Sequence, residues 1–159
     1  RSVAVVGAGI TGVTVAYALA KRGLQVTVFD RNRYPAMETS FANGGQLSAS
    51  NAEVWNHPGN IIKGIKWMFA ADAPLLFNMT PSWHKYSWIA EFFAAMRNYE
   101  SNTVRSAEIA IMAREHLSAW AQEEGINFDH EKRGIVHIYR SEKATKHARM
   151  VNGLLDRAG

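Results

Sequence analysis

The chain has 159 residues, of which 47% are apolar and 20% charged, a composition typical of a globular protein rather than of a disordered or fibrous one. It contains no cysteine, which excludes disulfide scaffolds, thiolate metal sites and cysteine nucleophiles. The formal net charge of +4 is modest and no basic cluster stands out, so we expect no nucleic-acid binding. No apolar stretch could span a bilayer and no secretory signal is expected, which favours a cytoplasmic location.

The first thirty residues have the pattern strand, glycine turn, helix, strand and terminal acid. Ser2–Val6 is a short apolar run rich in β-branched residues, typical of a strand buried on both faces in a parallel sheet. Val13–Arg22 has apolar residues at helical spacing, and Gly23 follows where a helix C-cap is expected. Residues 25–29 are the second expected strand, and Asp30 stands at its end.

The sequence Gly7-Ala8-Gly9-Ile10-Thr11-Gly12 joins the first strand to the helix. In the dinucleotide-binding motif, the first glycine permits the turn, the second lets the backbone approach a pyrophosphate, and the third lets the helix pack on the sheet. The helix N-terminus offers unpaired N–H groups and partial positive charge to phosphates. Asp30 is placed to accept hydrogen bonds from an adenosine ribose and would repel a 2′-phosphate. The motif predicts a bound dinucleotide and leaves FAD and NAD both open.

A second segment with small residues, amides and hydroxyls follows at residues 38–48. It includes two consecutive glycines, Gly44 and Gly45. Such residues suit a backbone that approaches a ligand and donates N–H groups to it, and they also suit an ordinary surface turn. Residue types alone do not decide between these two interpretations.

Taken together, these motifs resemble the FAD-dependent amino-acid oxidoreductases of the D-amino-acid oxidase type, most closely the bacterial D-amino-acid dehydrogenases. The residues that carry the resemblance are Gly7–Gly12, Asp30-Arg31, Glu38-Thr39-Ser40, Ala42–Gln46, Trp55, Pro58-Gly59, Ile65–Phe69 and Ala73-Pro74-Leu75. Asp30 is a departure, since glutamate is commoner there in the family, but the shorter acid can still reach a ribose. The resemblance runs at varying strength over the whole chain.

The resemblance implies FAD as the cofactor, with the glycine turn and Asp30 at its ADP half and Asn43–Leu47 along the pyrophosphate and flavin end. The implied cofactor contacts are Gly7, Ala8, Gly9, Ile10, Thr11, Gly12, Asp30, Arg31, Ser40, Asn43, Gly44, Gly45, Gln46 and Leu47. It implies no catalytic residue in this chain, because the arginine that binds the substrate carboxylate in the family would lie beyond Gly159.

The expected fold class is α/β, with a Rossmann-like FAD-binding βαβ unit and flavin loop in residues 1–52. A mainly helical, aromatic-rich segment is expected in 53–125 and the start of an α+β substrate domain in 126–159. Family members are longer, so we expect the fold to be incomplete in this chain. The remaining part would come from the same protein or from a partner chain.

Four of the five tryptophans follow residue 52 within about forty residues. Three interpretations of this aromatic segment stay open: core packing, the wall of a substrate pocket, and a membrane-surface patch in which Lys63, Lys66 and Lys85 lie beside tryptophans. Pro81-Ser82 is a plausible helix start, and Tyr86, Ile89, Phe93 and Met96 follow at helical spacing.

A further helix is expected from about Thr103 to Glu124, ended by Gly125. Its apolar stripe consists of Ile109, Met112, Ala113, Leu117 and Trp120. Asn127–Asp129 and Gly134–Tyr139 are typical of a strand pair, and a helix is expected at Ser141–Arg157 with Ser141 as N-cap. The histidines show no metal-ligand spacing, so no metal site is expected.

The implied activity is FAD-dependent oxidation of the Cα–N bond of an amino acid. A D-amino acid would yield a 2-oxo acid and ammonia, with electrons passed to a quinone-type acceptor or to oxygen. The protein could then contact the inner face of the cell membrane peripherally. Glycine, proline or N-methyl amino acids are alternative substrates. An NAD-dependent dehydrogenase and a non-catalytic nucleotide-binding module are alternatives of other classes.

Overall fold

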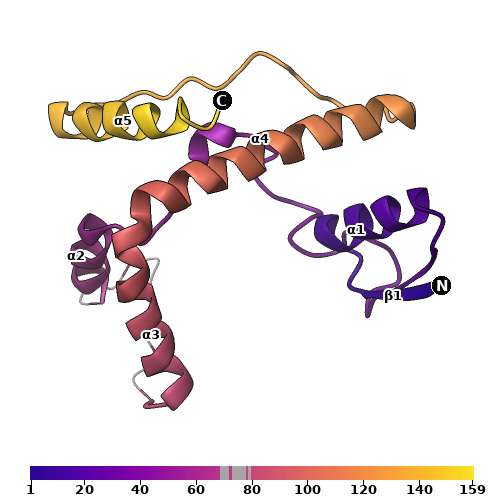
Figure 1. Ribbon diagram of the computed structural model, residues 1–159, viewed down its shortest axis with the longest axis horizontal. Coiled ribbons are helices and arrows are strands. Elements are labelled where there is room, and N and C mark those ends of the chain that lie inside the picture. Colours follow the sequence, from indigo (N-terminus) through magenta and orange to yellow (C-terminus); the bar gives the residue numbers. More distant parts are fainter. Residues whose placement is uncertain (69–71, 73–77, 79) are drawn as a thin grey trace. The chain divides into compact units, whose positions relative to one another are not determined.

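The computed structural model describes residues 1–68, 72, 78 and 80–159. Two parts of the family resemblance, Phe69 and Ala73–Leu75, lie outside these described residues. The described chain contains both helices and strands (Figure 1) and divides into two compact units, Arg1–Gln46 and Leu47–Gly159. We call them the first and the second unit.

The first unit is a strand–helix–strand arrangement of β1 (Ser2–Val6), α1 (Ile10–Lys21) and β2 (Gln25–Phe29). The two strands pair in parallel, with Ser2 opposite Gln25 and Val6 opposite Phe29. Parallel pairing requires the chain to cross back over the sheet, and α1 is that crossover. The predicted order and both strand positions are confirmed, while the helix begins at Ile10 instead of Val13.

Three glycines set the turns of the first unit. Gly7 has a φ of +98°, a backbone conformation that side chains disfavour, and Gly23 has a φ of +79° just after α1. The Gly23 N–H donates to the Ala20 carbonyl at 2.9 Å and so closes the end of the helix. Gly12 packs so tightly that a Cβ built on it would lie 1.8 Å from the Gly7 carbonyl oxygen. The predicted packing role of Gly12 is therefore confirmed.

The expected burial of β1 on both faces is wrong. Its residues alternate between exposed and half-buried, and Val6 at its end is 88% exposed. Phe29, at the end of β2, is 57% exposed. The reason is coverage: α1 packs on the sheet, and the described residues of this unit include neither a helix on the other face nor a third strand.

The second unit is helical. Its elements are η1 (Ala49–Asn51), α2 (Pro58–Trp67), α3 (Trp83–Ala95), η2 (Met96–Asn98), α4 (Tyr99–Glu123) and α5 (Glu142–Leu155). The predicted N-cap of α5 is confirmed, because Ser141 Oγ accepts a hydrogen bond from the Ala144 N–H at 3.2 Å. Ser82 caps α3 in the same way, accepting from the Lys85 N–H at 3.2 Å. The sequence did not reveal α2, whose N-cap is His57.

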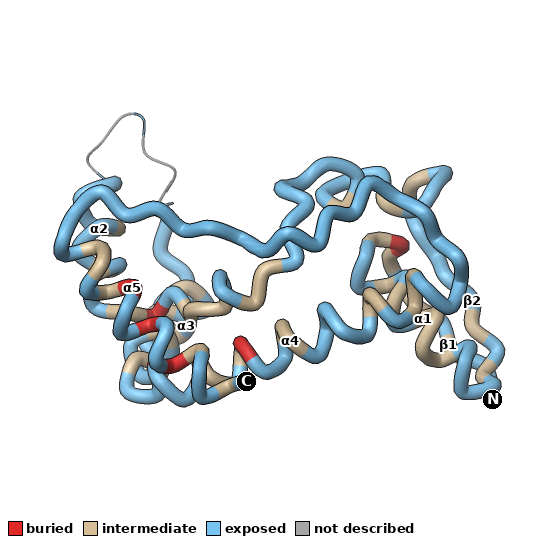
Figure 2. Tube along the Cα trace, turned by 90° about the horizontal axis from the view of Figure 1, so that it is seen from above, coloured by how far each residue is buried: buried red, intermediate tan, exposed pale blue. Residues whose placement is uncertain are grey.

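Most of the buried positions of the second unit gather where α4 and α5 lie side by side (Figure 2). These are Tyr99, Thr103 and Ala107 of α4 and Ala148, Val151 and Leu154 of α5, while Asn56 is buried just before α2. The predicted apolar stripe of α4 does not supply this buried face, since Ile109 is 67% and Met112 is 56% exposed. On α4 these positions are four residues apart and on α5 three, spacings that place side chains on one face of a helix.

Glu53 connects three segments of the second unit. The Tyr99 hydroxyl donates to Glu53 Oε1 at 2.6 Å, and His147 Nε2 lies 3.0 Å from the same oxygen. The His57 ring packs against Tyr99 and His147, with ring centroids 5.1 and 5.5 Å apart. Burial, and then the bond to Glu53, raises the pKa of Tyr99. Among the described residues, no three His, Asp or Glu side chains are grouped to hold a metal ion.

The predicted strand pair at Asn127–Asp129 and Gly134–Tyr139 is wrong, because these residues form neither helix nor strand. Val136 and Ile138 are 86% and 84% exposed. A lone two-stranded hairpin is only marginally stable, and the described part of the chain offers this segment no third strand. A short apolar, β-branched run without a partner strand does not make a sheet.

Core packing of the aromatic segment is also wrong for the described residues. Trp55, Trp67, Trp83 and Trp88 are 82%, 42%, 85% and 58% exposed. Trp88 stacks on Phe92 of its own helix, with ring centroids 5.4 Å apart, instead of packing against a sheet. The other two interpretations stay predictions.

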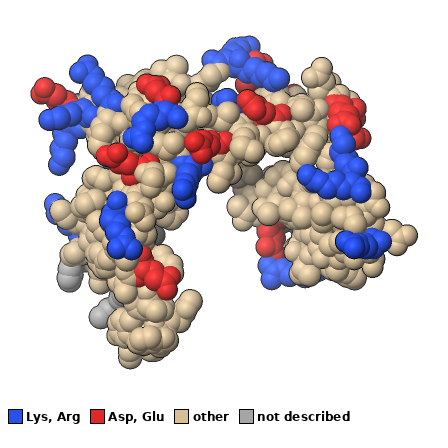
Figure 3. Space-filling model, in the orientation of Figure 1, with Lys and Arg blue, Asp and Glu red and all other residues tan. Residues whose placement is uncertain are grey.

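The surface carries both signs of charge. On the face that Figure 3 displays, Lys and Arg side chains are interspersed with Asp and Glu. None of the helices in the described ranges is long and apolar enough to cross a membrane.

Replacing Gly12 with alanine tests the helix–turn contact. Because the new Cβ would lie 1.8 Å from the Gly7 carbonyl oxygen, α1 must move away from the turn. We expect the free energy of unfolding to fall by at least about 2 kcal/mol in urea titrations followed by circular dichroism.

The matched control is Gly153→Ala, inside α5, where nothing lies within 4 Å of the added Cβ. That variant should be neutral or up to about 1 kcal/mol more stable, because alanine is the better helix former. Equal effects of the two substitutions would contradict the crowding argument.

Candidate functional site

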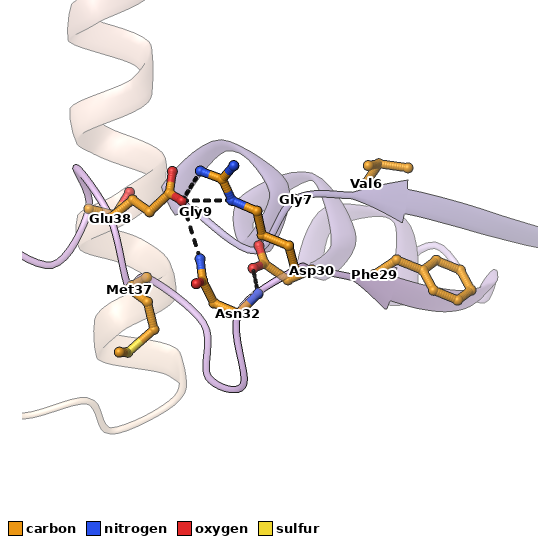
Figure 4. Close-up of a pocket in the computed structure, with 11 residues that line it drawn as sticks. Val6, Gly7, Gly9, Phe29, Asp30, Asn32, Met37 and Glu38 are labelled. Carbon is orange, nitrogen blue, oxygen red and sulfur yellow. Dashed lines mark hydrogen bonds and ion pairs between the residues drawn. The ribbon is translucent and has the colours of Figure 1, made fainter.

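A pocket of about 390 Å³ lies in the first unit, at the carboxyl ends of β1 and β2 (Figure 4). Ligands of open α/β sheets bind at these strand ends, and the volume suits a small ligand or part of a larger one. The lining residues are Val6, Gly7, Gly9, Phe29, Asp30, Arg31, Asn32, Ala36, Met37, Glu38 and Ser40. Five of the predicted cofactor contacts are among them: Gly7, Gly9, Asp30, Arg31 and Ser40.

Asp30 is tied to the glycine turn. The Ala8 N–H donates to Asp30 Oδ2 at 2.6 Å, and the Asn32 N–H donates to Oδ1 at 2.7 Å. These two backbone bonds, the one from Ala8 first, lower the pKa of Asp30 and keep it ionised. An ionised carboxylate accepts hydrogen bonds on several lone pairs, so it can also accept from a ligand hydroxyl. The spacing that singled out Asp30 thus corresponds to a contact between the two ends of the motif.

Ser40 lies at the start of α1. The Ile10 N–H donates to Ser40 Oγ at 3.0 Å, and a Cβ on Gly9 would come within 3.2 Å of the same oxygen. Since the hydroxyl accepts this bond, its own hydrogen stays available for donation to another group. A donating hydroxyl at the positive end of a helix is suited to an anionic ligand such as a phosphate. The structure thus brings Ser40 to Gly9 and Ile10, about thirty residues earlier in the sequence.

Three contacts in the pocket were not predicted from the sequence. Arg31 Nε donates to Glu38 Oε1 at 2.8 Å, and Nη2 of the same arginine pairs with that oxygen. Asn32 Nδ2 also approaches Glu38 Oε1, at 3.3 Å (Figure 4). The Ala36 N–H donates to the Ala8 carbonyl at 2.9 Å, with a φ of +60° at Ala36. The opposite charges of Arg31 and Glu38, seven residues apart, were the one signal that could have revealed the pair.

The predicted contacts Asn43, Gly44, Gly45, Gln46 and Leu47 are not among the lining residues of this pocket. Asn43 Oδ1 accepts from the Gly45 N–H at 2.8 Å, which makes a tight turn with a φ of +60° at Gly45. Leu47 is the first residue of the second unit. Ile10, Thr11 and Gly12 also lie outside the lining, in the first turn of α1.

Residues 2–158 match the FAD dependent oxidoreductase (DAO) family. The chain belongs to this family. Its members are defined by their use of FAD, which fits a pocket built on a glycine turn, an acid and a helix N-terminus. The family also agrees with the resemblance that the sequence motifs suggested.

Three relatives are similar to the chain over most of its length. It is 57% identical over 157 residues to D-amino acid dehydrogenase 3 of Mesorhizobium japonicum. It is 40% identical over 153 residues to D-amino acid dehydrogenase of Paramagnetospirillum magneticum, and 37% over 159 residues to that of Neisseria meningitidis serogroup C.

These matches cover 99%, 92% and 99% of this chain but only 38%, 35% and 38% of the relatives. The chain therefore spans little more than a third of the length of these relatives. No solved structure matched it.

The lowered pKa of Asp30 predicts a pH dependence. Because folding lowers this pKa, the stabilisation from Asp30 is present above its unfolded value of about 3.9 and is lost as pH falls through the folded value. We expect acid to destabilise the wild-type protein more than Asp30→Asn, measured by urea unfolding from neutral pH to below about pH 3. Asp129→Asn, in the second unit, controls for the loss of one carboxylate. Identical pH profiles for wild type and Asp30→Asn would show that this carboxylate contributes nothing.

Proposed function

We propose that the chain provides the FAD-binding part of an enzyme that oxidises the Cα–N bond of a D-amino acid. The observation that carries the proposal is the pocket in which Asp30 and the N-terminus of α1 meet. The names of the three relatives, all D-amino acid dehydrogenases, support the substrate class. The products would be a 2-oxo acid and ammonia, after hydrolysis of the imino acid.

The residues present fit the ADP half of FAD. Asp30 would accept hydrogen bonds from the ribose hydroxyls, while the N–H groups at the start of α1 and the Ser40 hydroxyl would receive the pyrophosphate. Gly9 leaves this approach open, because a side chain there would occupy the space in front of Ser40. When bound, FAD supplies the two-electron acceptor for the substrate, and the protein supplies orientation and electrostatics.

The finer architecture belongs to the same proposal. Residues 1–52 would form a Rossmann-like βαβ unit with its flavin loop, residues 53–125 a helical segment, and residues 126–159 the start of a substrate domain. The contacts along the pyrophosphate and flavin end would include Asn43, Gly44, Gly45, Gln46 and Leu47. The remaining contacts, at the ADP half, would be Ala8, Ile10, Thr11, Gly12 and Arg31. The arginine that binds the substrate carboxylate in the family would come from outside this chain.

Absorption spectroscopy of the full-length protein tests the cofactor and the substrate together. We expect flavin bands that bleach when D-amino acids are added without oxygen, because the cofactor takes up the substrate electrons. Glycine, L-proline and N-methyl amino acids are the comparison substrates. If these compounds alone bleach the flavin bands, they and not D-amino acids are the substrate class.

The same spectra separate the other classes of function. Flavin bands that no amino acid bleaches would favour a non-catalytic nucleotide-binding module. If the purified protein contains no flavin and binds NAD, the result would favour an NAD-dependent dehydrogenase.

Peripheral contact with the inner face of the cell membrane, and transfer of electrons to a quinone there, form the second part of the proposal. On α2, Ile62 and Ile65 are 60% and 53% exposed and lie on one face, with Lys63 and Lys66 beside them. An apolar face next to lysines suits an anionic lipid surface.

Vesicle flotation tests this contact. We expect the full-length protein to float with phosphatidylglycerol vesicles, and a variant with Ile62→Ser and Ile65→Ser to float several-fold less, because it lacks the apolar face. Ile109→Ser, which changes an isoleucine of α4 that is 67% exposed, is the matched control. Equal flotation of all three proteins would contradict a role for α2.

A further inference from the structure

The charged residues of the pocket are unequal in number. Its lining contains two carboxylates, Asp30 and Glu38, and one guanidinium, Arg31. The other lining residues are uncharged, so the lining carries a formal charge of −1. A second cation of the same loop, Arg33, lies over the Tyr34 ring at 5.2 Å and is not part of the lining. Arg31 is therefore the cation that a ligand in this pocket would meet.

An arginine beside the ribose-binding acid has a known consequence in nucleotide-binding folds. It is the residue that accommodates a 2′-phosphate, because a guanidinium binds phosphate oxygens in a fork geometry. Here Arg31 immediately follows Asp30 and lines the same pocket. By residue type alone, then, Arg31 would attract a 2′-phosphate that Asp30 repels.

Glu38 resolves this conflict. It takes up the Arg31 guanidinium through both Nε and Nη2, and Asn32 Nδ2 approaches the same carboxylate oxygen. Figure 4 shows the Asn32 and Glu38 side chains pointing toward one another. The loop is fixed on the glycine turn by the bond from the Ala36 N–H to the Ala8 carbonyl. The Arg31 guanidinium is thus already paired with Glu38 at the position where it would otherwise bind a 2′-phosphate.

We propose that Glu38 is a specificity-determining residue, which holds Arg31 and makes the pocket selective for an adenosine with a free 2′-hydroxyl over one with a 2′-phosphate. The inference rests on the proposed function, in that the adenosine ribose lies at Asp30. FAD has a free 2′-hydroxyl on this ribose, so the pairing costs FAD nothing. The Arg31 and Glu38 side chains are 80% and 55% exposed, so the pair contributes little to stability, and its effect is on selectivity.

The test compares two ligands that differ only by the 2′-phosphate: 5′-AMP and adenosine 2′,5′-bisphosphate. Each is titrated calorimetrically into the flavin-free full-length protein, as wild type and as Glu38→Gln. We expect the wild type to prefer 5′-AMP, and Glu38→Gln to shift the ratio of the two affinities by about tenfold or more toward the bisphosphate, because one negative charge is removed and Arg31 is released. Glu108→Gln on α4 is the matched control and should leave the ratio unchanged.

A double-mutant cycle with Arg31→Gln separates selectivity from a structural role. If Glu38 acts through Arg31, the shift caused by Glu38→Gln should be clearly smaller in the Arg31→Gln background. An equal shift in both backgrounds, or equal weakening of both ligands, would overturn the inference. FAD binding, followed by flavin fluorescence, is measured alongside. If the wild type binds FAD but Glu38→Gln leaves the ratio of the two affinities unchanged, this inference alone is overturned. If the wild type binds neither FAD nor 5′-AMP, the proposed function is overturned as well.

Discussion

The close approach of α1 to the turn after β1 is the contact on which the candidate site depends. Residue 12 has no side chain, and the Gly7 carbonyl occupies the space that a Cβ would need. This contact brings the N-terminus of α1 to the carboxyl ends of both strands. There the Ala8 N–H reaches Asp30 and the Ile10 N–H reaches Ser40. The site is thus held by bonds from backbone N–H groups to side-chain oxygens, and it needs little buried apolar surface to form.

The second unit is held differently, because a polar cluster stands at the centre of its contacts. Glu53 accepts from Tyr99 of α4 and lies beside His147 of α5. The pKa of Tyr99 is raised, so its hydroxyl remains a donor throughout the neutral range. The bond from Tyr99 therefore connects α4 to the segment between η1 and α2.

Features that depend on residues close in sequence were predicted correctly, whereas features that depend on distant partners were not. Both strands, the glycine turn and the cap at Ser141 depend on neighbouring residues, and all were predicted. The strand pair within residues 126–140 and the burial of β1 depend on distant partners, and both predictions were wrong. In the site, the distance between motif and acid predicted Asp30. The Glu38 contacts were not predicted, because the opposite charge of Arg31 was the one signal for them and the loop between the two has the unusual backbone of Ala36.

The distribution of charge in the pocket would give a nucleotide bound there one preferred orientation. The start of α1 presents N–H groups and a hydroxyl, which favour phosphates, whereas the pocket-lining residues of the loop after β2 carry a formal charge of −1. A nucleotide placed in the opposite sense would bring its phosphates against Asp30 and Glu38. Such a placement loses the helix N-terminus and adds repulsion between like charges, so the two effects reinforce each other. The order of these groups along the chain would therefore set the orientation of a nucleotide bound in this pocket.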